Sequence, residues 1–201
     1  MFVESLILST IVGKIRGGKI KNIGSLKIKG WYLFLLGFLL EYSSIYIEKL
    51  TDNKLSFFIR EYFSYIQFLV IILFILGFIL NLRNKVILMM FIGSLFNFIA
   101  ILLNDGKMPV SMEALKYSSL IKDIDMLKTG ITLTHQIATN STRFYFFTDI
   151  LPIPAPYPLP KVISVGDIII ALGVFILIQK IMLSGKRKDS ILDFTYGICK
   201  L

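Results

Sequence analysis

Residues Val86–Leu103 read VILMMFIGSLFNFIAILL and carry no charged side chain. An α-helix of this length rises about 27 Å, close to the hydrocarbon thickness of a bilayer, which is about 30 Å. Three further apolar runs of similar length are Trp31–Ile47, Tyr62–Leu82 and Val165–Leu183. Because lipid offers the backbone no hydrogen-bond partner, such runs cross a membrane as helices. The sequence therefore predicts an all-α, polytopic transmembrane helix bundle with four long spans.

The composition indicates the same class. Hydrophobic residues make up 55% of the 201 residues, charged residues only 17%, and the mean hydropathy is +0.75. These values are too apolar for an ordinary soluble domain, and the length allows a single integral membrane domain, residues 1–201. The formal net charge is +9. The Lys and Arg residues flank the apolar runs and do not form a basic face interleaved with aromatic side chains, as in proteins that bind nucleic acid. We therefore expect a lipid bilayer, and no nucleic acid, as partner.

The positions of the cations predict the orientation. They fill the connection at residues 14–29, the turn at residues 83–85 and the stretch at residues 186–188. In membrane proteins the cytoplasmic connections carry the excess of Lys and Arg. We therefore expect a multi-pass protein of the cell membrane whose basic connections and C-terminal tail, residues 184–201, are cytoplasmic. The long connection, residues 104–164, then lies outside the cytoplasm.

The N-terminal apolar segment, Met1–Val12, is shorter than the four runs. About 13 residues rise only about 20 Å as a helix. The segment is either a short, tilted span with its N-terminus outside, or a helix that enters the bilayer without crossing it. We favour the short span, which brings the predicted number of spans to five.

Turn and cap signals predict that the long outer connection is folded. Gly106 suits the left-handed end of a helix, and Ser111 can cap a new helix that runs towards Lys128. Residues Ile131–Thr139 alternate apolar and polar side chains, as in an extended piece or a short helix. Five of the six prolines lie at residues 152–160, which makes that piece an extended, stiff strap. We expect a folded extracytoplasmic cap on the bundle.

Titratable residues in or beside this connection are the catalytic candidates, His135, Asp149 and Asp167. His135 is the only histidine, and histidine is the side chain that titrates near neutrality without a perturbed pKa. Asp149 would orient its ring, as a carboxylate does in general-base catalysis. Asp167 lies at the outer start of the last span, where a carboxylate is a functional candidate. Together with Ser164 it also fits a capping box, which is the interpretation that we favour for it.

Four further residues are candidates for binding: Asn104, Lys107, Pro109 and Arg143. Asn104 and Pro109 belong to the turn that opens the connection, and Lys107 and Arg143 are its available cations. The single cysteine, Cys199, and the single histidine give no metal cluster. We expect no metal and no other cofactor.

Polar residues and glycines inside the spans predict how the helices pack. Gln67 and Asn97 are more typical of interhelical hydrogen bonds than of substrate contacts. Gly166 and Gly173 lie seven residues apart on one helix face. We expect these glycines to allow the close approach of a neighbouring helix.

Several motifs resemble those of a known family. They are NDGKMPV at Asn104–Val110, Asp149 with the proline-rich piece that follows it, VISVGD at Val162–Asp167, and RGG at residues 16–18. On these motifs the chain resembles an uncharacterised, domain-of-unknown-function family of bacterial multi-pass membrane proteins with Asn-Gly-x-Met-Pro-like and Ser-x-Gly-Asp motifs. The resemblance covers nearly the whole chain and implies an architecture but no activity. Asp105 stands where this pattern leads us to expect a second glycine.

Three classes of function remain. No catalytic motif stands out, so we expect a non-catalytic membrane component whose extracytoplasmic loop binds a membrane-protein or lipid partner. The alternative is a membrane-embedded enzyme that acts on a lipid-linked substrate at the outer leaflet, which requires His135, Asp149 and Asp167 to meet in a pocket. A small transporter is a further alternative, but few charges lie within the spans and no internal repeat is evident.

Overall fold

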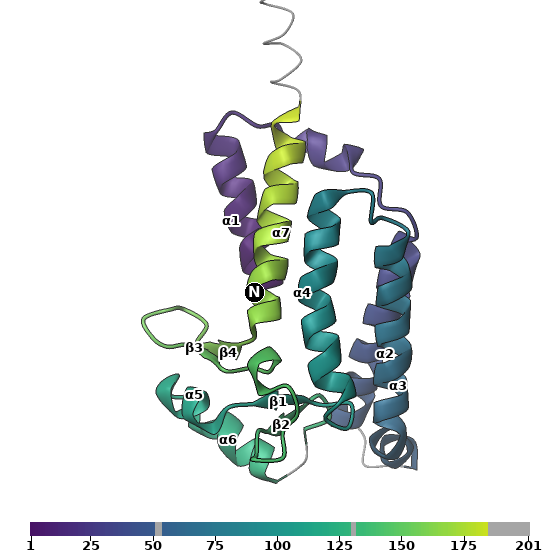
Figure 1. Cartoon of the computed structure of the whole chain (residues 1–201), viewed down its shortest axis with the longest axis vertical. Helices are drawn as coiled ribbons and strands as arrows, with labels where there is room; N and C mark the ends of the chain where they lie inside the picture. The colour runs from purple at the N-terminus through teal and green to yellow at the C-terminus, as the bar shows by residue number, and fades with distance from the viewer. Residues whose placement is uncertain (51–53, 130–131, 185–201) are drawn as a thin grey trace, which may run out of the picture.

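The computed structural model describes residues 1–50, 54–129 and 132–184, and this part of the chain is mostly helical (Figure 1). Within these ranges, five longer helices run between two ends of the molecule. They are α1 (Phe2–Ile15), α2 (Trp31–Leu50), α3 (Lys54–Ile79), α4 (Lys85–Leu102) and α7 (Val165–Met182). A short 3-10 helix, η1 (Ile20–Ser25), follows α1. All four apolar runs of the sequence are therefore helical.

Three of these helices have the length and composition of membrane spans. Among the described residues, α3, α4 and α7 are long and apolar enough to cross a membrane. α2 has 20 residues, but its second half carries Glu41, Glu48 and two serines, and it is not among the three. α1 is the shortest of the five longer helices, with 14 residues. Length and apolar composition thus support three of the predicted spans.

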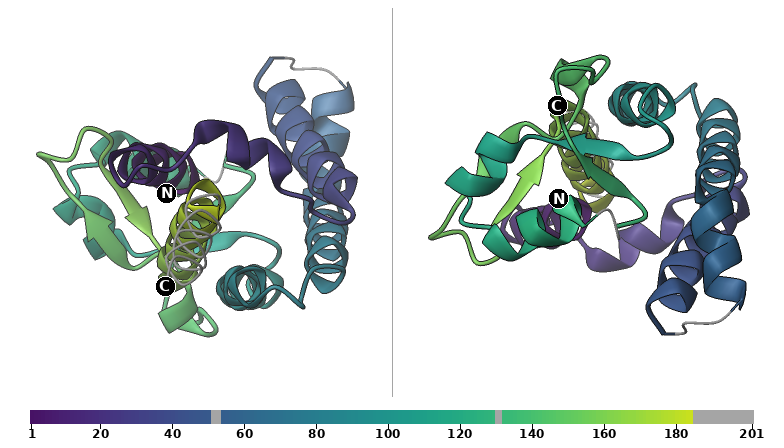
Figure 2. Two further views of the ribbon diagram at one scale, coloured as in Figure 1. Left: turned by 90° about the horizontal axis from the view of Figure 1, so that it is seen from above. Right: turned by 90° about the horizontal axis from the view of Figure 1, so that it is seen from below.

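The longer helices form two groups (Figure 2). In the first group, α2 and α3 pack as a hairpin in which the Phe34 ring contacts the rings of Phe74 and Phe78. In the second group, α7 packs against both α1 and α4. Ring contacts between α3 and α4 join the groups, with Phe74 against Phe98 and Phe78 against Phe91.

α1 runs parallel to α7. The Ser5 hydroxyl donates to the Ala171 carbonyl at 2.5 Å, and the Gln179 side-chain amide donates to the Ser9 carbonyl at 2.6 Å. The order of these contacts is the same along both helices. Met1 therefore lies at the end where α7 begins, and the basic residues after α1 lie at the end where α7 stops.

Glycines allow α4 and α7 to approach each other closely. A Cβ atom added to Gly166 would lie 2.5 Å from the carbonyl oxygen of Gly93, and it would also overlap the side-chain oxygen of Asn97. A Cβ atom on Gly173 would overlap the Met90 side chain of α4. The prediction that these two glycines of α7 allow close helix packing is confirmed.

The described residues of the connection 104–164, called the cap below, fold at one end of the helices (Figure 1). The elements of the cap are β1 (Met108–Val110), α5 (Met112–Tyr117), α6 (Ile121–Lys128), β2 (His135–Ile137), η2 (Tyr145–Phe147), β3 (Leu151–Ile153) and β4 (Lys161–Ile163). β1 pairs in parallel with β2, and β3 pairs antiparallel with β4. These two small sheets correct the all-α prediction to a mostly helical fold. The proline-rich piece, predicted as an extended strap, is instead part of a β-hairpin. Its prolines lie in β3 and in the loop before β4.

The single helix predicted to run from Ser111 towards Lys128 is interrupted. Ser111 caps α5 as expected, since its hydroxyl oxygen accepts a backbone N–H of the first turn. α5 then ends because Ser119 adopts a left-handed conformation with φ of 58°. The Leu120 N–H returns to the Leu115 carbonyl at 3.0 Å. This is the bond of a Schellman motif, which ends a helix and is here built on serine instead of glycine.

The cap contacts both helix groups. Leu133 packs against Ile59 and Phe63 of α3. Phe147 stacks on Phe96 of α4, with ring centroids 4.5 Å apart and ring planes 6° from parallel. The cap therefore bridges the α2–α3 hairpin and the group around α7.

The basic connections lie together at the end opposite the cap (Figure 1). They are residues 16–30, after α1, and residues 80–84, between α3 and α4. The predicted cytoplasmic tail beyond Ser184, with Cys199, lies outside the described residues, as do residues 51–53 between α2 and α3.

Candidate functional site

Strand β1 brings the two halves of the site together. On one edge, Met108 of β1 pairs with His135 of β2. On the other edge, Val110 pairs with Asp149 as an isolated parallel bridge. The Asp149 N–H donates to the Pro109 carbonyl at 3.0 Å. His135 and Asp149 are thereby held by backbone hydrogen bonds on either side of one short strand.

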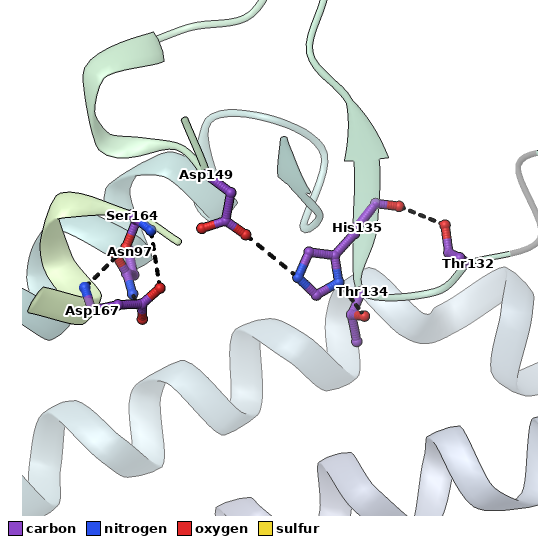
Figure 3. Close-up of polar contacts among 7 residues, drawn as sticks. All are labelled: Asn97, Thr132, Thr134, His135, Asp149, Ser164 and Asp167. Carbon is purple, nitrogen blue, oxygen red and sulfur yellow. Dashed lines mark hydrogen bonds and ion pairs between the residues drawn. The ribbon is translucent and has the colours of Figure 1, made fainter. Parts of the chain in front are cut away.

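The imidazole of His135 and the carboxyl group of Asp149 face each other (Figure 3). Side chains alternate along a strand and paired residues share a face, so both residues project from the same side of β1. Nε2 of His135 and Oδ2 of Asp149 are 3.7 Å apart, a contact longer than a hydrogen bond. The other ring nitrogen, Nδ1, lies 2.7 Å from the Thr134 hydroxyl oxygen. The structure thus brings together two of the three catalytic candidates.

A cavity of about 250 Å³ opens beside this pair. Its titratable lining residues are Asp123, His135, Asp149 and Lys161. The other lining residues are Val110, Leu115, Leu120, Met126, Leu127, Thr132, Pro160 and Val162. At about 30 Å³ for each water molecule, the volume equals that of about eight waters. The site is therefore suited to a small molecule or a headgroup with an apolar part.

The carboxyl group of Asp149 is poorly solvated. The residue is only 7% exposed, and its Oδ1 has no hydrogen-bond partner among the described residues. Burial and the nearby negative charge of Asp167 raise the pKa of Asp149 to about 8. The imidazole of His135 lies half-exposed at the rim of the cavity. Partial removal from water lowers its pKa, and this effect exceeds the rise that the negative charges of Asp167 and Asp123 cause. Both members of the pair are therefore mainly uncharged at neutral pH.

Asp167 belongs to a separate hydrogen-bond network (Figure 3). Its N–H donates to Ser164 Oγ and its Oδ2 accepts the Ser164 N–H, both at 3.0 Å, which confirms the predicted capping box of α7. The Asn97 amide of α4 donates to Asp167 Oδ1 at 3.0 Å, and its oxygen accepts from the Ser164 hydroxyl at 2.7 Å. The expected interhelical role of Asn97 is thus confirmed. Asp167 does not line the cavity, so the pocket contains two of the three catalytic candidates that the enzyme alternative requires.

The four binding candidates make structural contacts and do not line the cavity. Asn104 is buried, and its side chain bonds to the last turn of α4 and to both backbone groups of Arg143. The Lys107 ammonium donates to the Thr132 carbonyl at 2.9 Å. Pro109 is fully buried, and Arg143 is exposed. A binding role for these residues stays a prediction.

Sequence reasoning missed Asp123 and Lys161 as members of the site. The ammonium of Lys161 forms an ion pair with the Glu4 carboxylate of α1 and lies 5.4 Å from the centre of the Tyr157 ring. The apolar residues of α6 were a usable signal for one wall of the cavity, but nothing in the sequence aligned β4 with that wall. Across the described ranges, no group of three His, Cys, Asp or Glu side chains is arranged to hold a metal ion.

Comparison with known proteins places the chain in a family. A family model described as a family of unknown function, DUF5317, matches residues 25–179. The chain belongs to this family. An uncharacterized protein of Thermotoga maritima is 30% identical over 176 residues, which cover 88% of this chain and 86% of that protein. No solved structure matches the chain.

The resemblance to a family of unknown function that the motifs predicted is thus confirmed. The DUF5317 match begins before α2 and ends within α7. It therefore contains the whole cap and every residue that lines the cavity.

Proposed function

We propose that this DUF5317 protein is a multi-pass membrane protein whose cap lies outside the cytoplasm and binds a small or lipid-linked molecule in the cavity beside His135 and Asp149. The role is binding and not catalysis. Five helices cross the bilayer, with α1 as a short, tilted span. The observation that carries the proposal is the buried Asp149 carboxyl group in the wall of a largely apolar cavity, with one oxygen that has no hydrogen-bond partner in the described part of the chain.

The distribution of charged and aromatic residues supports this topology. The basic connections lie at one end of the helices and the cap at the other, as the positive-inside rule requires for an outer cap. The parallel arrangement of α1 and α7 agrees with an odd number of crossings. Exposed tyrosines gather towards the cap end of α2 and α3, where an aromatic belt would meet the outer interface. They are Tyr42, Tyr46, Tyr62 and Tyr65.

The chemistry of the cavity supports binding over catalysis. A protonated Asp149 has no negative charge with which to activate the His135 ring, and the two groups are not hydrogen-bonded. A buried polar atom without a partner costs about 1–3 kcal/mol. A ligand that offers a donor group to this carboxyl would recover that free energy. The apolar walls would hold the rest of the ligand.

Blocking the cavity tests the binding role. Leu120 lines the cavity, whereas the next residue, Ile121, is 65% exposed and does not. The full chain, purified in mild detergent and mixed with total lipid extract from the producing cells, would be studied by native mass spectrometry. We expect a bound molecule on the wild type and on Ile121→Trp, but not on Leu120→Trp. The same adduct on all three proteins would remove the cavity as the binding site.

Labelling in intact cells tests the orientation. In a Cys199→Ser background, Lys122→Cys places a thiol on α6 of the cap and Lys21→Cys places one in η1 at the basic end. We expect a membrane-impermeant maleimide to label position 122 in intact cells and position 21 only after lysis. The reverse pattern would place the cap in the cytoplasm.

The neutral imidazole beside a carboxylic acid favours a second candidate function. An enzyme would use His135 as the base and Asp149 as the acid on a lipid-linked substrate. In that case the molecule recovered from the wild type would change mass with time, while His135→Ala would bind it and leave it unaltered. A molecule that stays chemically unchanged on the wild type would exclude this candidate.

A further inference from the structure

Carboxyl groups outnumber ammonium groups in the lining of the cavity. The lining contributes two carboxyl groups, Asp123 and Asp149, and one ammonium group, Lys161. The ammonium is already paired with the Glu4 carboxylate and lies against the Tyr157 ring. The chain as a whole has a net charge of +9, whereas the lining of the cavity has no net positive charge.

A third carboxylate, that of Asp167, does not line the cavity but affects the groups that do. The negative charge of Asp167 contributes to the raised pKa of Asp149 and also acts on His135. A cation in the cavity would be attracted by the carboxylates of Asp123 and Asp167, and by that of Asp149 once Asp149 has lost its proton. It would also offer donor hydrogens to the carboxyl group of Asp149, one oxygen of which has no hydrogen-bond partner among the described residues. An anion in the same place would be repelled.

We propose that the ligand of the cap is an organic cation, in which a protonated amine is joined to an apolar body. The inference deepens the proposed binding function and rests on it. The ammonium group lies between Asp149 and Asp123, and the apolar body lies against Leu115, Leu120 and Leu127. A volume equal to about eight waters accepts an amine of similar size. Such an amine is either a free molecule or the headgroup of an aminophospholipid.

Binding of the cation is coupled to release of a proton. Asp149 is mainly protonated at neutral pH, since its pKa is about 8, and a bound ammonium group lowers that pKa. The titratable groups around it are His135 of β2 and Asp167 of α7. Asp123 of α6 and Lys161 of β4 complete the titratable lining. The affinity therefore rises as the pH increases towards about 8 and then levels off while the amine stays protonated.

Three ligands with the same apolar chain test the inference. Isothermal titration of the full-length protein in detergent would compare n-hexylamine, 1-hexanol and hexanoate. We expect hexylamine to bind about tenfold or more tightly than the other two at pH 8. Asp149→Asn should lose most of this preference. Asp125→Asn should retain it, because Asp125 is an exposed residue of α6 outside the lining.

The outcomes separate the cation from binding in the cavity as such. If hexanol or hexanoate binds as tightly as hexylamine, the cation is excluded while binding in the cavity stands. If none of the three binds, both the inference and the proposed function fail. Should Asp149→Asn fail to fold, the wild type alone decides, because an affinity for hexylamine that does not change between pH 6 and pH 8 overturns the proposal.

A competition experiment identifies the source of the amine. Dihexanoyl phosphatidylethanolamine and dihexanoyl phosphatidylglycerol share their chains and differ in the headgroup amine. Displacement of hexylamine by the first lipid and not by the second assigns the site to an aminophospholipid headgroup. Displacement by neither assigns it to a free amine. Equal displacement by both overturns the amine as the recognised group.

Discussion

Asp149 and Asp167 are two aspartates of one short segment with opposite surroundings. Both side-chain oxygens of Asp167 accept hydrogen bonds, from Ser164 and from Asn97. One oxygen of Asp149 lies 3.7 Å from the His135 ring, and within the described ranges the other has no hydrogen-bond partner. The satisfied carboxylate closes a helix end and joins two helices. The unsatisfied one lines a cavity, so the contrast separates a residue that maintains the fold from a residue that is available to a ligand.

The two aspartates differ because Asp167 has hydrogen-bond donors close by in the sequence and on a neighbouring helix, whereas Asp149, among the described residues, does not. Asp167 finds a donor three residues away, at the N-cap Ser164 of its own helix, and a second donor on the neighbouring helix, whose close approach the glycines allow. Asp149 is positioned only by its backbone, in a bridge to Val110. Burial of its side chain costs free energy that hydrogen bonds of the same side chain to the described residues do not offset. The following predictions test this distinction, in order of decreasing effect.

The largest effect is expected for Gly166→Ala. The new methyl group would overlap Asn97 and the Gly93 carbonyl, so α4 and α7 must separate. Overpacking of this kind costs about 1–3 kcal/mol, and we expect the upper end because a backbone atom is involved. The free energy of unfolding, measured in detergent with increasing SDS, is the readout.

Gly24→Ala is the matched control for this substitution. Apart from its chain neighbours and the backbone of its own helix, no atom of the described residues lies within 4 Å of the position that a Cβ would occupy on Gly24, so the stability of this variant should equal that of the wild type. Equal stabilities of the two variants would mean that α4 and α7 are not in close contact at Gly166.

A smaller loss is expected for Asp167→Ala. The substitution removes the acceptors of the Ser164 N–H and of the Asn97 amide, at a cost of about 1–2 kcal/mol. Asp125→Ala, at an exposed position of α6, should leave stability within about 0.5 kcal/mol of the wild type. If the two alanine variants unfold together, the network around Asp167 does not stabilise the fold.

The opposite sign is expected for Asp149→Asn. The pKa of Asp149 is about 8 in the folded protein and about 3.9 when unfolded, so the folded state binds the proton more tightly. Wild-type stability from this group is therefore greatest below about pH 4 and is lost as the pH rises through 8. The variant lacks this loss and should be more stable than the wild type above pH 8, by about 1 kcal/mol. Unfolding curves at several pH values measure it, and destabilisation at every pH would make Asp149 a structural residue like Asp167.

The smallest effect is expected for Ser119→Gly in the cap. Ser119 has a φ of 58°, a conformation that glycine adopts more readily, so the variant should gain about 0.5 kcal/mol. Ser118→Gly should instead lose stability, because Ser118 has a φ of −81° and a buried hydroxyl directed at the Lys161 carbonyl. Thermal unfolding of the two variants measures both changes. A loss in both would mean that the break between α5 and α6 is not strained.

Local interactions account for what could be predicted. The N-cap at Ser111 and the capping box at Ser164 involve residues within one helical turn, so their spacing is visible in the sequence. The break between α5 and α6 was missed because serine, not glycine, takes the left-handed position at 119. Asp105, where the family pattern led us to expect a second glycine, adopts a left-handed conformation with φ of 59°, which glycine adopts readily.

The sequence by itself determined the apolar helices, the gathering of cations in certain connections, and the capping box that Ser164 and Asp167 form at the start of α7. These features depend on the length and periodicity of single segments or on contacts three residues apart. Only the tertiary structure decided that His135 faces Asp149, because their contact requires two different segments to pair with opposite edges of β1. It also decided that Lys161 and Asp123 share one cavity with them. Such pairings depend on the register of distant strands, and in strands of only three residues the local pattern is too short to specify a register.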